Sequence, residues 1–172
     1  MRLTISLAAL AAILATATPA LAGTSDTAKA DAKGTVLQPL TITKVDDLDF
    51  GWVISTTSAG TVVINADDGS RTQTGGVTLV TSYPGGRATF GGAGTPGNAV
   101  TLTLASPTEL ISTTNPADKV LVNSMTLDSG GSSRTIASDS TFLVGVGGAF
   151  AIAANQPNGF YKAQFSVTAD YQ

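Results

Sequence analysis

The clearest pattern in the sequence is an alternation of apolar and polar residues at the end of the chain. Apolar side chains recur at every second position, at Tyr161, Ala163, Phe165, Val167, Ala169 and Tyr171. The residues between them, from Lys162 to Asp170, are polar. Because successive strand side chains point to opposite faces, the pattern predicts one half-buried strand from Gly159 to the terminus.

Shorter apolar or alternating runs recur along the rest of the chain. They predict strands at 36–45, 60–65, 77–80, 87–90, 99–105, 119–128 and 142–146, with a further apolar set at 150–152 after a break at Gly147-Gly148. The run at 119–128 places Leu121, Met125 and Leu127 on one face, and Gly147-Gly148 predicts a bulge or turn. No window shows a capped helical period, and an Asp-Gly turn at 68–69 is typical of a hairpin. We therefore predict an all-β fold, an antiparallel immunoglobulin-like β-sandwich that is either complete or short of one strand.

The start of the chain has a different pattern. Arg2, the apolar stretch 3–17 and the sequence Ala-Leu-Ala at 20–22 predict that residues 1–22 are a secretory signal peptide. A membrane anchor is the alternative, but the apolar stretch is short for a span. We predict a flexible arm at 23–34 and one β-sandwich domain at 35–172, with no membrane span after signal cleavage.

The arm carries small residues at every second position, at Ala28, Ala30, Ala32, Gly34 and Val36. This alternation makes the arm a candidate donor strand for another molecule. The alternative is a solvated leader that alternates by chance, since the segment 23–33 has no large apolar residue with which to order itself.

Composition excludes several classes of function. The chain has no histidine and no cysteine, so Ser-His-Asp and Cys-His catalysis and zinc sites built from these residues are excluded. A formal net charge of −3 without a basic cluster argues against nucleic-acid binding. We predict no catalytic residues, no cofactor and no enzymatic activity.

Two acidic clusters remain as candidate calcium ligands, Asp46-Asp47-Leu48-Asp49 and Asp67-Asp68. Neither has the spacing of a calcium loop, and Asp also favours turns through local backbone hydrogen bonds. We therefore predict turn chemistry and no metal site. Glu109 is the only glutamate, so a glycosidase pair of carboxylates is also disfavoured.

Four aromatic residues are candidates for stacking on a carbohydrate: Trp52, Tyr83, Tyr161 and Tyr171. Tyr161 and Tyr171 share the apolar face of the last strand, which favours a core or interface position. Trp52 lies near Phe50, and we expect it in the core.

The C-terminal segment resembles the signature of chaperone–usher pilins, the subunits of bacterial fimbriae. Tyr171 is penultimate, alternating apolar residues precede it, and Gly159 is fourteenth from the end. The chain departs from many pilins in lacking a disulfide. It is also similar to an uncharacterised family of secreted bacterial proteins, through Pro39-Leu40-Thr41-Ile42, Leu48-Asp49-Phe50-Gly51 and the segment from Gly159 to Tyr171.

The resemblance implies a fimbrial subunit assembled by donor-strand complementation. The acceptor strand, which a chaperone would also contact, would comprise Gly159, Tyr161, Ala163, Phe165, Val167, Ala169 and Tyr171. The implied partners are identical or related subunits in a head-to-tail polymer, a periplasmic chaperone and an outer-membrane usher. The implied location is the periplasm in transit and then the cell surface. The alternative is a monomeric secreted or cell-surface β-sandwich that binds a carbohydrate or another surface.

Overall fold

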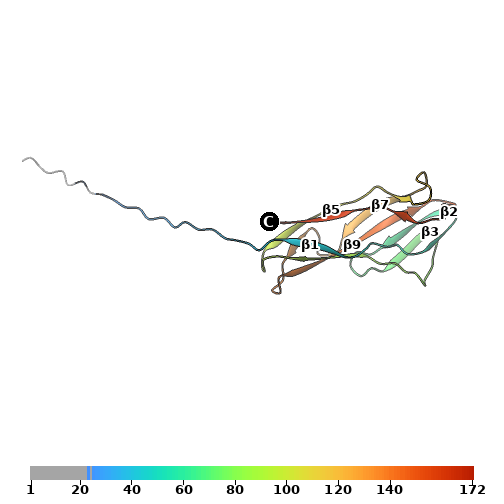
Figure 1. Ribbon diagram of the computed structural model, residues 1–172. Helices are drawn as coiled ribbons and strands as arrows, with labels where there is room; N and C mark the ends of the chain where they lie inside the picture. Colours follow the sequence, from blue (N-terminus) through green and yellow to red (C-terminus); the bar gives the residue numbers. More distant parts are fainter. Residues whose placement is uncertain (1–22, 24) are drawn as a thin grey trace, which may run out of the picture. The chain divides into compact units, whose positions relative to one another are not determined.

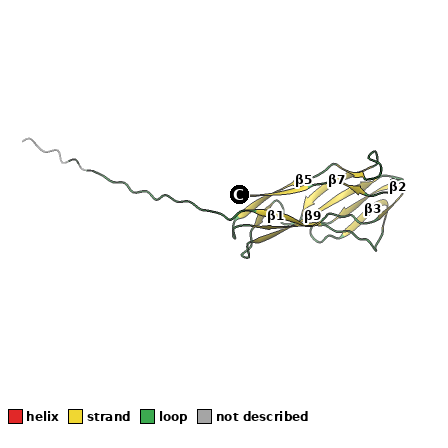
Figure 2. Ribbon diagram, in the orientation of Figure 1, coloured by secondary structure: helices red, strands yellow, loops and turns green. Residues whose placement is uncertain are grey.

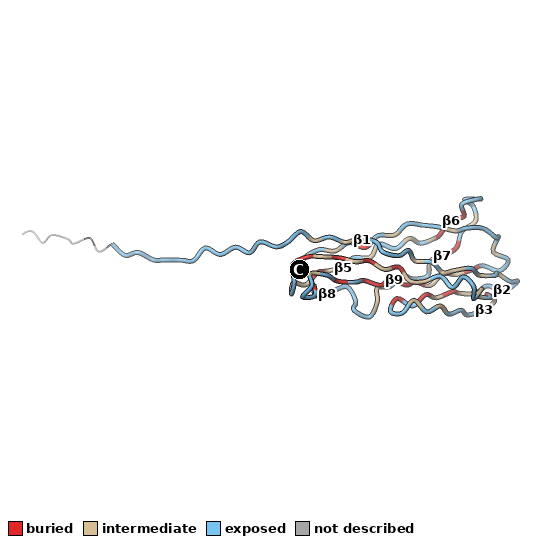
Figure 3. The backbone as a smooth tube through the Cα atoms, turned by 60° about the horizontal axis from the view of Figure 1, so that its bottom comes forward, coloured by how far each residue is buried: buried red, intermediate tan, exposed pale blue. Residues whose placement is uncertain are grey.

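The computed structural model describes Gly23 and residues 25–172, so the predicted signal peptide at 1–22 lies outside the described residues. The chain divides into two units, Met1–Thr35 and Val36–Gln172. In the first unit, Gly23 and residues 25–35 are exposed (Figure 3), and they contain no helix or strand. The second unit contains all the described strands.

Val36–Gln172 is built from antiparallel strands joined by turns, and residues 25–172 contain no helix (Figure 2). This confirms the predicted all-β, sandwich-like fold. The strands are β1 (Thr41–Asp46), β2 (Val53–Ile64), β3 (Arg71–Leu79), β4 (Ala88–Ala93), β5 (Ala99–Ala105), β6 (Glu109–Ser112), β7 (Lys119–Leu127), β8 (Ser133–Thr135), β9 (Thr141–Ile152), β10 (Tyr161–Lys162) and β11 (Ser166–Tyr171).

The larger sheet is organised around β9, which crosses the middle of the domain (Figure 1). The first half of β9, Thr141–Val146, pairs with β4, and the second half, 148–152, pairs with β2. The opposite edge of β9 pairs with β7. Beyond these neighbours lie β1 next to β4, β3 next to β2, and β6 and β10 next to β7.

The smaller sheet has the order β11-β5-β8. One core cluster lies between the two sheets, because its buried residues come from β4 and β9 of the larger sheet and from β5 and β11 of the smaller one. A second cluster is formed by β2, β3, β6, β7 and β9, all of which belong to the larger sheet. The larger sheet therefore curls to enclose a core of its own.

The predicted single strand from Gly159 to the terminus is wrong. Its first part, β10, pairs with β6 in the larger sheet, whereas β11 pairs with β5 in the smaller sheet. The chain crosses between the sheets at 163–165, and Ala163 is exposed there. Apolar and polar residues alternate on both sides of the crossing because β10 and β11 each turn one face to the interior of the domain.

The predicted break at Gly147-Gly148 is also wrong, because β9 runs unbroken through it. These glycines allow a close backbone approach: a Cβ on Gly147 would lie 2.3 Å from the carbonyl oxygen of Ile64. Leu121 is not on the face of Met125 and Leu127. A register shift between Val122 and Ser124 changes the phase of β7, which leaves Leu121 57% exposed while the other two pack against the first core cluster.

Candidate functional site

The last strand of the chain has only one neighbouring strand. Within residues 25–172, β11 pairs with β5 along its whole length, from Ser166 opposite Ala105 to Tyr171 opposite Val100, and with no other strand. The edge of β11 that faces away from β5 is therefore an open edge. Unpaired N–H and C=O groups on such an edge are a template for pairing with another segment of chain.

The alternation of hydrogen-bonded and non-bonded residue pairs identifies which backbone groups of β11 lie on its open edge. Gln172 N–H donates to the carbonyl oxygen of Ala99 at 3.0 Å, so this pair is a hydrogen-bonded one. Hydrogen-bonded and non-bonded pairs alternate along an antiparallel ladder, and the β11–β5 register has no shift. Thr168 and Asp170 therefore direct their backbone groups toward β5, whereas Val167, Ala169 and Tyr171 direct theirs to the open edge.

The same three residues turn their side chains to the core. Val167 is 8% exposed, and Ala169 and Tyr171 are half-buried against the first core cluster. Phe165, just before the strand, packs edge-on against Phe90 with ring centroids 5.9 Å apart. The open edge is thus held in place by a packed apolar face, as expected for a strand that accepts a partner without refolding.

Tyr171 fixes the end of β11 to the segment before β1. Its Oη donates to the carbonyl oxygen of Gln38 at 2.8 Å and accepts a hydrogen bond from Thr95 N–H at 2.8 Å. The penultimate position of Tyr171 singled it out in the sequence. Its two partners could not be found there, because they are backbone groups far away in the chain.

The other predicted acceptor residues, Gly159, Tyr161 and Ala163, do not belong to this edge. Gly159 and Ala163 are exposed, and Tyr161 lies in β10 and packs against the second core cluster. The Tyr161 Oη donates to the carbonyl oxygen of Pro157 at 2.6 Å. The acceptor segment is therefore shortened to the residues from Phe165 to Tyr171.

The predicted donor residues are exposed. Ala28, Ala30, Ala32 and Gly34 fall in the first unit, and Val36 falls in the second. Val36 is 96% exposed, although valine is apolar. Burying a valine side chain contributes about 1.5–3 kcal/mol, so a partner that covers Val36 would be stabilised by burying it.

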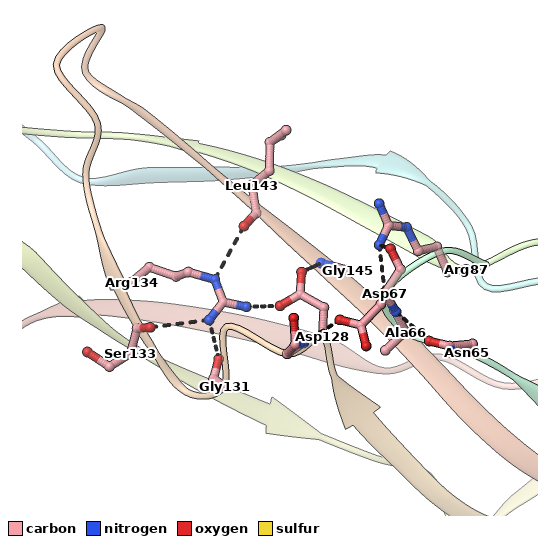
Figure 4. Close-up of polar contacts among 11 residues, drawn as sticks. Asn65, Ala66, Asp67, Arg87, Asp128, Gly131, Ser133, Arg134, Leu143 and Gly145 are labelled. Carbon is pink, nitrogen blue, oxygen red and sulfur yellow. Dashed lines mark hydrogen bonds and ion pairs between the residues drawn. The ribbon is translucent and has the colours of Figure 1, made fainter. Parts of the chain in front are cut away.

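A polar cluster supports β9 where strand pairing stops (Figure 4). Beyond Leu127, the last residue of β7, the edge of β9 is bonded by side chains: the Asp128 carboxylate accepts from Gly145 N–H at 2.7 Å, and Arg134 Nε donates to the carbonyl oxygen of Leu143 at 3.4 Å. Arg134 also forms an ion pair with Asp128. These contacts replace a missing strand, so the cluster has a structural role.

Three acidic residues accept backbone hydrogen bonds, two of them within a turn and one from a distant segment. The Asp67 carboxylate accepts from Ser129 N–H, Asp68 accepts from Ser70 N–H, and Asp139 accepts from Thr141 Oγ1 and N–H. These hydrogen bonds hold the pKa of each carboxyl below its usual value.

In the other acidic cluster, the Asp49 carboxylate accepts from Gly51 N–H, and Asp47 forms an ion pair with Lys44. Within the described part of the chain, no three ionisable residues are grouped so that they could hold a metal ion. No helix among those residues has the length and apolar character needed to cross a membrane.

The expectation that Trp52 lies in the core is wrong. Trp52 is 59% exposed and stacks on Tyr83, which is 51% exposed, with ring centroids 3.8 Å apart and an interplanar angle of 17°. Phe50 occupies the core position instead and packs against Phe150 at 5.0 Å. The glycine between Phe50 and Trp52 has a positive φ of 71°, which breaks the strand alternation and turns Trp52 outward.

Neither the curated proteins nor the solved structures contain a match to the chain. A family described as a domain of unknown function (DUF4402) matches residues 40–171, from just before β1 to the last residue of β11. The chain therefore belongs to the DUF4402 family.

Proposed function

We propose that this chain is a structural subunit of a bacterial surface fibre, in which the N-terminal arm of one copy adds as a strand to the open edge of β11 in the next copy. The observation that carries this proposal is the open edge itself. It combines a packed inner face with outward backbone groups at Val167, Ala169 and Tyr171. Strand addition at such an edge is a common mode of peptide recognition.

Main-chain pairing supplies most of the attraction. Each of the three outward residues offers one donor and one acceptor, and a protein hydrogen bond contributes about 0.5–1.5 kcal/mol net. Among side chains, a methyl-sized group contributes about 0.8 kcal/mol, so the alanines of the arm add little. Val36 adds more, because it is exposed before association. The arm therefore binds chiefly through its backbone.

The geometry of such a contact produces a polymer. The arm and β11 are different surfaces of the same chain, so the contact is heterologous and head-to-tail, and it extends without closing unless its rotation happens to form a ring. A periplasmic chaperone would cover the open edge before assembly, and an outer-membrane usher would organise subunit exchange. The subunit would be exported through the periplasm to the cell surface, and its role would be structural, not enzymatic.

Engineered cysteines test this proposal directly, because the chain has none of its own. Thr168 points away from the core on β11, and Lys29, Asp31 and Lys33 are the outward positions of the arm in the proposed pairing. Side chains opposite each other on paired strands have Cβ atoms about 4.5–5.5 Å apart, close enough for a disulfide after small adjustment.

The experiment uses two exported full-length versions of the chain, which differ in size because they carry different tags. One carries Thr168→Cys and the other carries a cysteine at one arm position. We expect a mixed disulfide between the two chains for at least one arm position. The matched control is Thr72→Cys, an exposed position on β3, which is also an edge strand. The proposal would be contradicted if the protein stayed monomeric and formed no mixed disulfide. It would also be contradicted if the arm cysteine cross-linked equally well to a cysteine at position 72.

A second candidate function is a monomeric secreted module that binds a ligand on its surface. The exposed stack of Trp52 on Tyr83 favours it. The two functions are compatible, because this pair belongs to the segments beside β2 and β3 and uses no residue of β11.

A further inference from the structure

Two stacked aromatic rings form an exposed platform that contains no residue of β11. Trp52, the only tryptophan of the chain, and Tyr83 are both more than half exposed and stack on each other. Ile54, two residues further along β2, points the same way as Trp52 and is also exposed. Aromatic side chains gain most from burial, so exposing two of them together suggests a binding surface.

The platform is held rigidly by its backbone. Trp52 N–H donates to the carbonyl oxygen of Tyr83 at 3.1 Å, so the two residues that stack are also hydrogen-bonded. The Arg71 guanidinium donates to the carbonyl oxygens of Phe50, Trp52 and Val80 at 2.9, 3.2 and 2.7 Å. One half-buried cation thus ties together both segments that carry the rings.

Glycine allows the segment before Trp52 and the segment after Tyr83 to approach each other closely. Asp49 and Gly86 exchange backbone hydrogen bonds at 2.7 and 2.9 Å. Beside them, Gly85 has a positive φ of 70°, and a Cβ there would lie 2.1 Å from the carbonyl oxygen of Asp49. The rings are therefore pre-positioned, and a ligand would bind with little loss of side-chain entropy.

The chemistry of the surroundings limits the ligand. The nearest charged groups are engaged, since Arg71 bonds three carbonyls and the Asp49 carboxylate accepts from Gly51 N–H at 2.7 Å. The flanking polar residues are neutral and exposed, namely Thr78 opposite Ile54, and Thr81 and Ser82 before Tyr83. The surface thus offers the outer face of a stacked aromatic pair, with exposed hydroxyl-bearing residues beside it in the chain and across the strand pair.

We infer that Trp52 and Tyr83 form a binding platform for a neutral carbohydrate. A pyranose ring has an apolar face of C–H groups, which can stack on the outer face of the aromatic pair, and a rim of hydroxyl groups, which suits neutral polar neighbours such as Thr81 and Ser82. A phosphate or nucleic acid would require cationic groups that are not available here. The inference goes beyond the proposed fibre, because it needs neither the arm nor β11.

The single tryptophan makes the platform its own reporter, since all tryptophan fluorescence of the chain arises from Trp52. The monomeric full-length chain is titrated with cellohexaose, chitohexaose and xylohexaose. We expect a saturable change of emission with at least one of them. Tyr83→Ala keeps the reporter and should weaken that binding at least 10-fold. Phe160→Ala, which removes an aromatic ring that is 69% exposed elsewhere, should leave it unchanged.

Folding of each variant is checked by its urea unfolding midpoint. If Tyr83→Ala is not folded, Trp52→Ala is titrated by calorimetry instead, with the same 10-fold loss expected. An absence of saturable binding to all three hexasaccharides overturns the inference, and so does binding that survives loss of the platform. A response only to vesicles of phosphatidylethanolamine and phosphatidylglycerol also overturns it, because it would make the pair a membrane contact. Assembly is not part of the readout, so the fibre proposal can fail separately.

Discussion

Replacing Tyr171 with phenylalanine isolates the hydroxyl that fixes the end of β11. Tyr171 Oη donates to the carbonyl oxygen of Gln38 and accepts from Thr95 N–H, each at 2.8 Å. Tyr171→Phe removes one oxygen atom and keeps the ring packed against the first core cluster. Its effect therefore measures the hydroxyl contacts alone.

The expected loss of stability follows from these two hydrogen bonds. Each contributes about 0.5–1.5 kcal/mol net, so the variant should lose about 1–3 kcal/mol of unfolding free energy. The hydrogen bond with Thr95 N–H is part-buried, whereas the bond to the Gln38 carbonyl is exposed. Thr95 N–H therefore loses its partner without gaining a full replacement, while water can replace part of the bond to Gln38, which places the loss toward the lower end of this range.

Urea unfolding followed by far-ultraviolet circular dichroism measures the change as a shift of the midpoint at constant m-value. The matched control is Tyr83→Phe, because Tyr83 Oη makes no hydrogen bond within residues 25–172. A Tyr171→Phe midpoint equal to that of Tyr83→Phe would refute the reasoning. It would show that the end of β11 is held by ring packing and strand pairing only.

Three further predictions concern the scaffold. Gly147→Ala should destabilise the domain by about 1–3 kcal/mol or more, because its Cβ would meet the carbonyl oxygen of Ile64 at 2.3 Å; urea unfolding measures this, and a neutral effect would contradict the close approach. Arg134→Gln should cost about 3 kcal/mol, since the Asp128 carboxylate is left without its cation; an unfolding midpoint equal to wild type would show that the cluster does not support β9. Asp67, Asp68 and Asp139 have lowered pKa values in the folded chain, so the stability they add is present above their unfolded pKa of about 3.9 and is lost as the pH falls through the folded values. Thermal unfolding between pH 5 and pH 2 measures this loss, which should be smaller in Asp67→Asn.

Periodicity along the chain predicted the fold class but not the arrangement of strands. Residues 99–105 were found because Val100 and Leu102 alternate with threonines and lie in the core. β8, only three residues long, was missed, because Ser133–Thr135 contains no apolar residue and is defined by pairing with β5. Short strands of this kind depend on tertiary contacts that local sequence does not encode.

The candidate site was predictable in part. The alternation at Val167, Ala169 and Tyr171 correctly indicated an inward apolar face. It could not show where the strand begins, because Tyr161 alternates in phase although it belongs to the other sheet. Period-two patterns report which side faces the interior, and they do not report which strand lies alongside.

Trp52 illustrates another limit of sequence reasoning. Proximity to Phe50 suggested a shared core position, but the positive φ of Gly51 reverses the direction of the next side chain. Glycine adopts such a conformation readily, and nothing in the local sequence shows that it does so here. The exposed stack of Trp52 on Tyr83 therefore depends on the conformation of Gly51.

Amide hydrogen exchange along β11 tests the central claim most directly, because neighbouring residues serve as controls for one another. In the monomeric chain, the amides of Thr168 and Asp170, which face β5, should exchange slowly, and those of Val167 and Ala169 should exchange fast. A synthetic peptide of residues 25–37 should then slow exchange at Val167 and Ala169 specifically. Slow exchange at these two amides before any peptide is added, or no change after it, would contradict an open edge that accepts the arm.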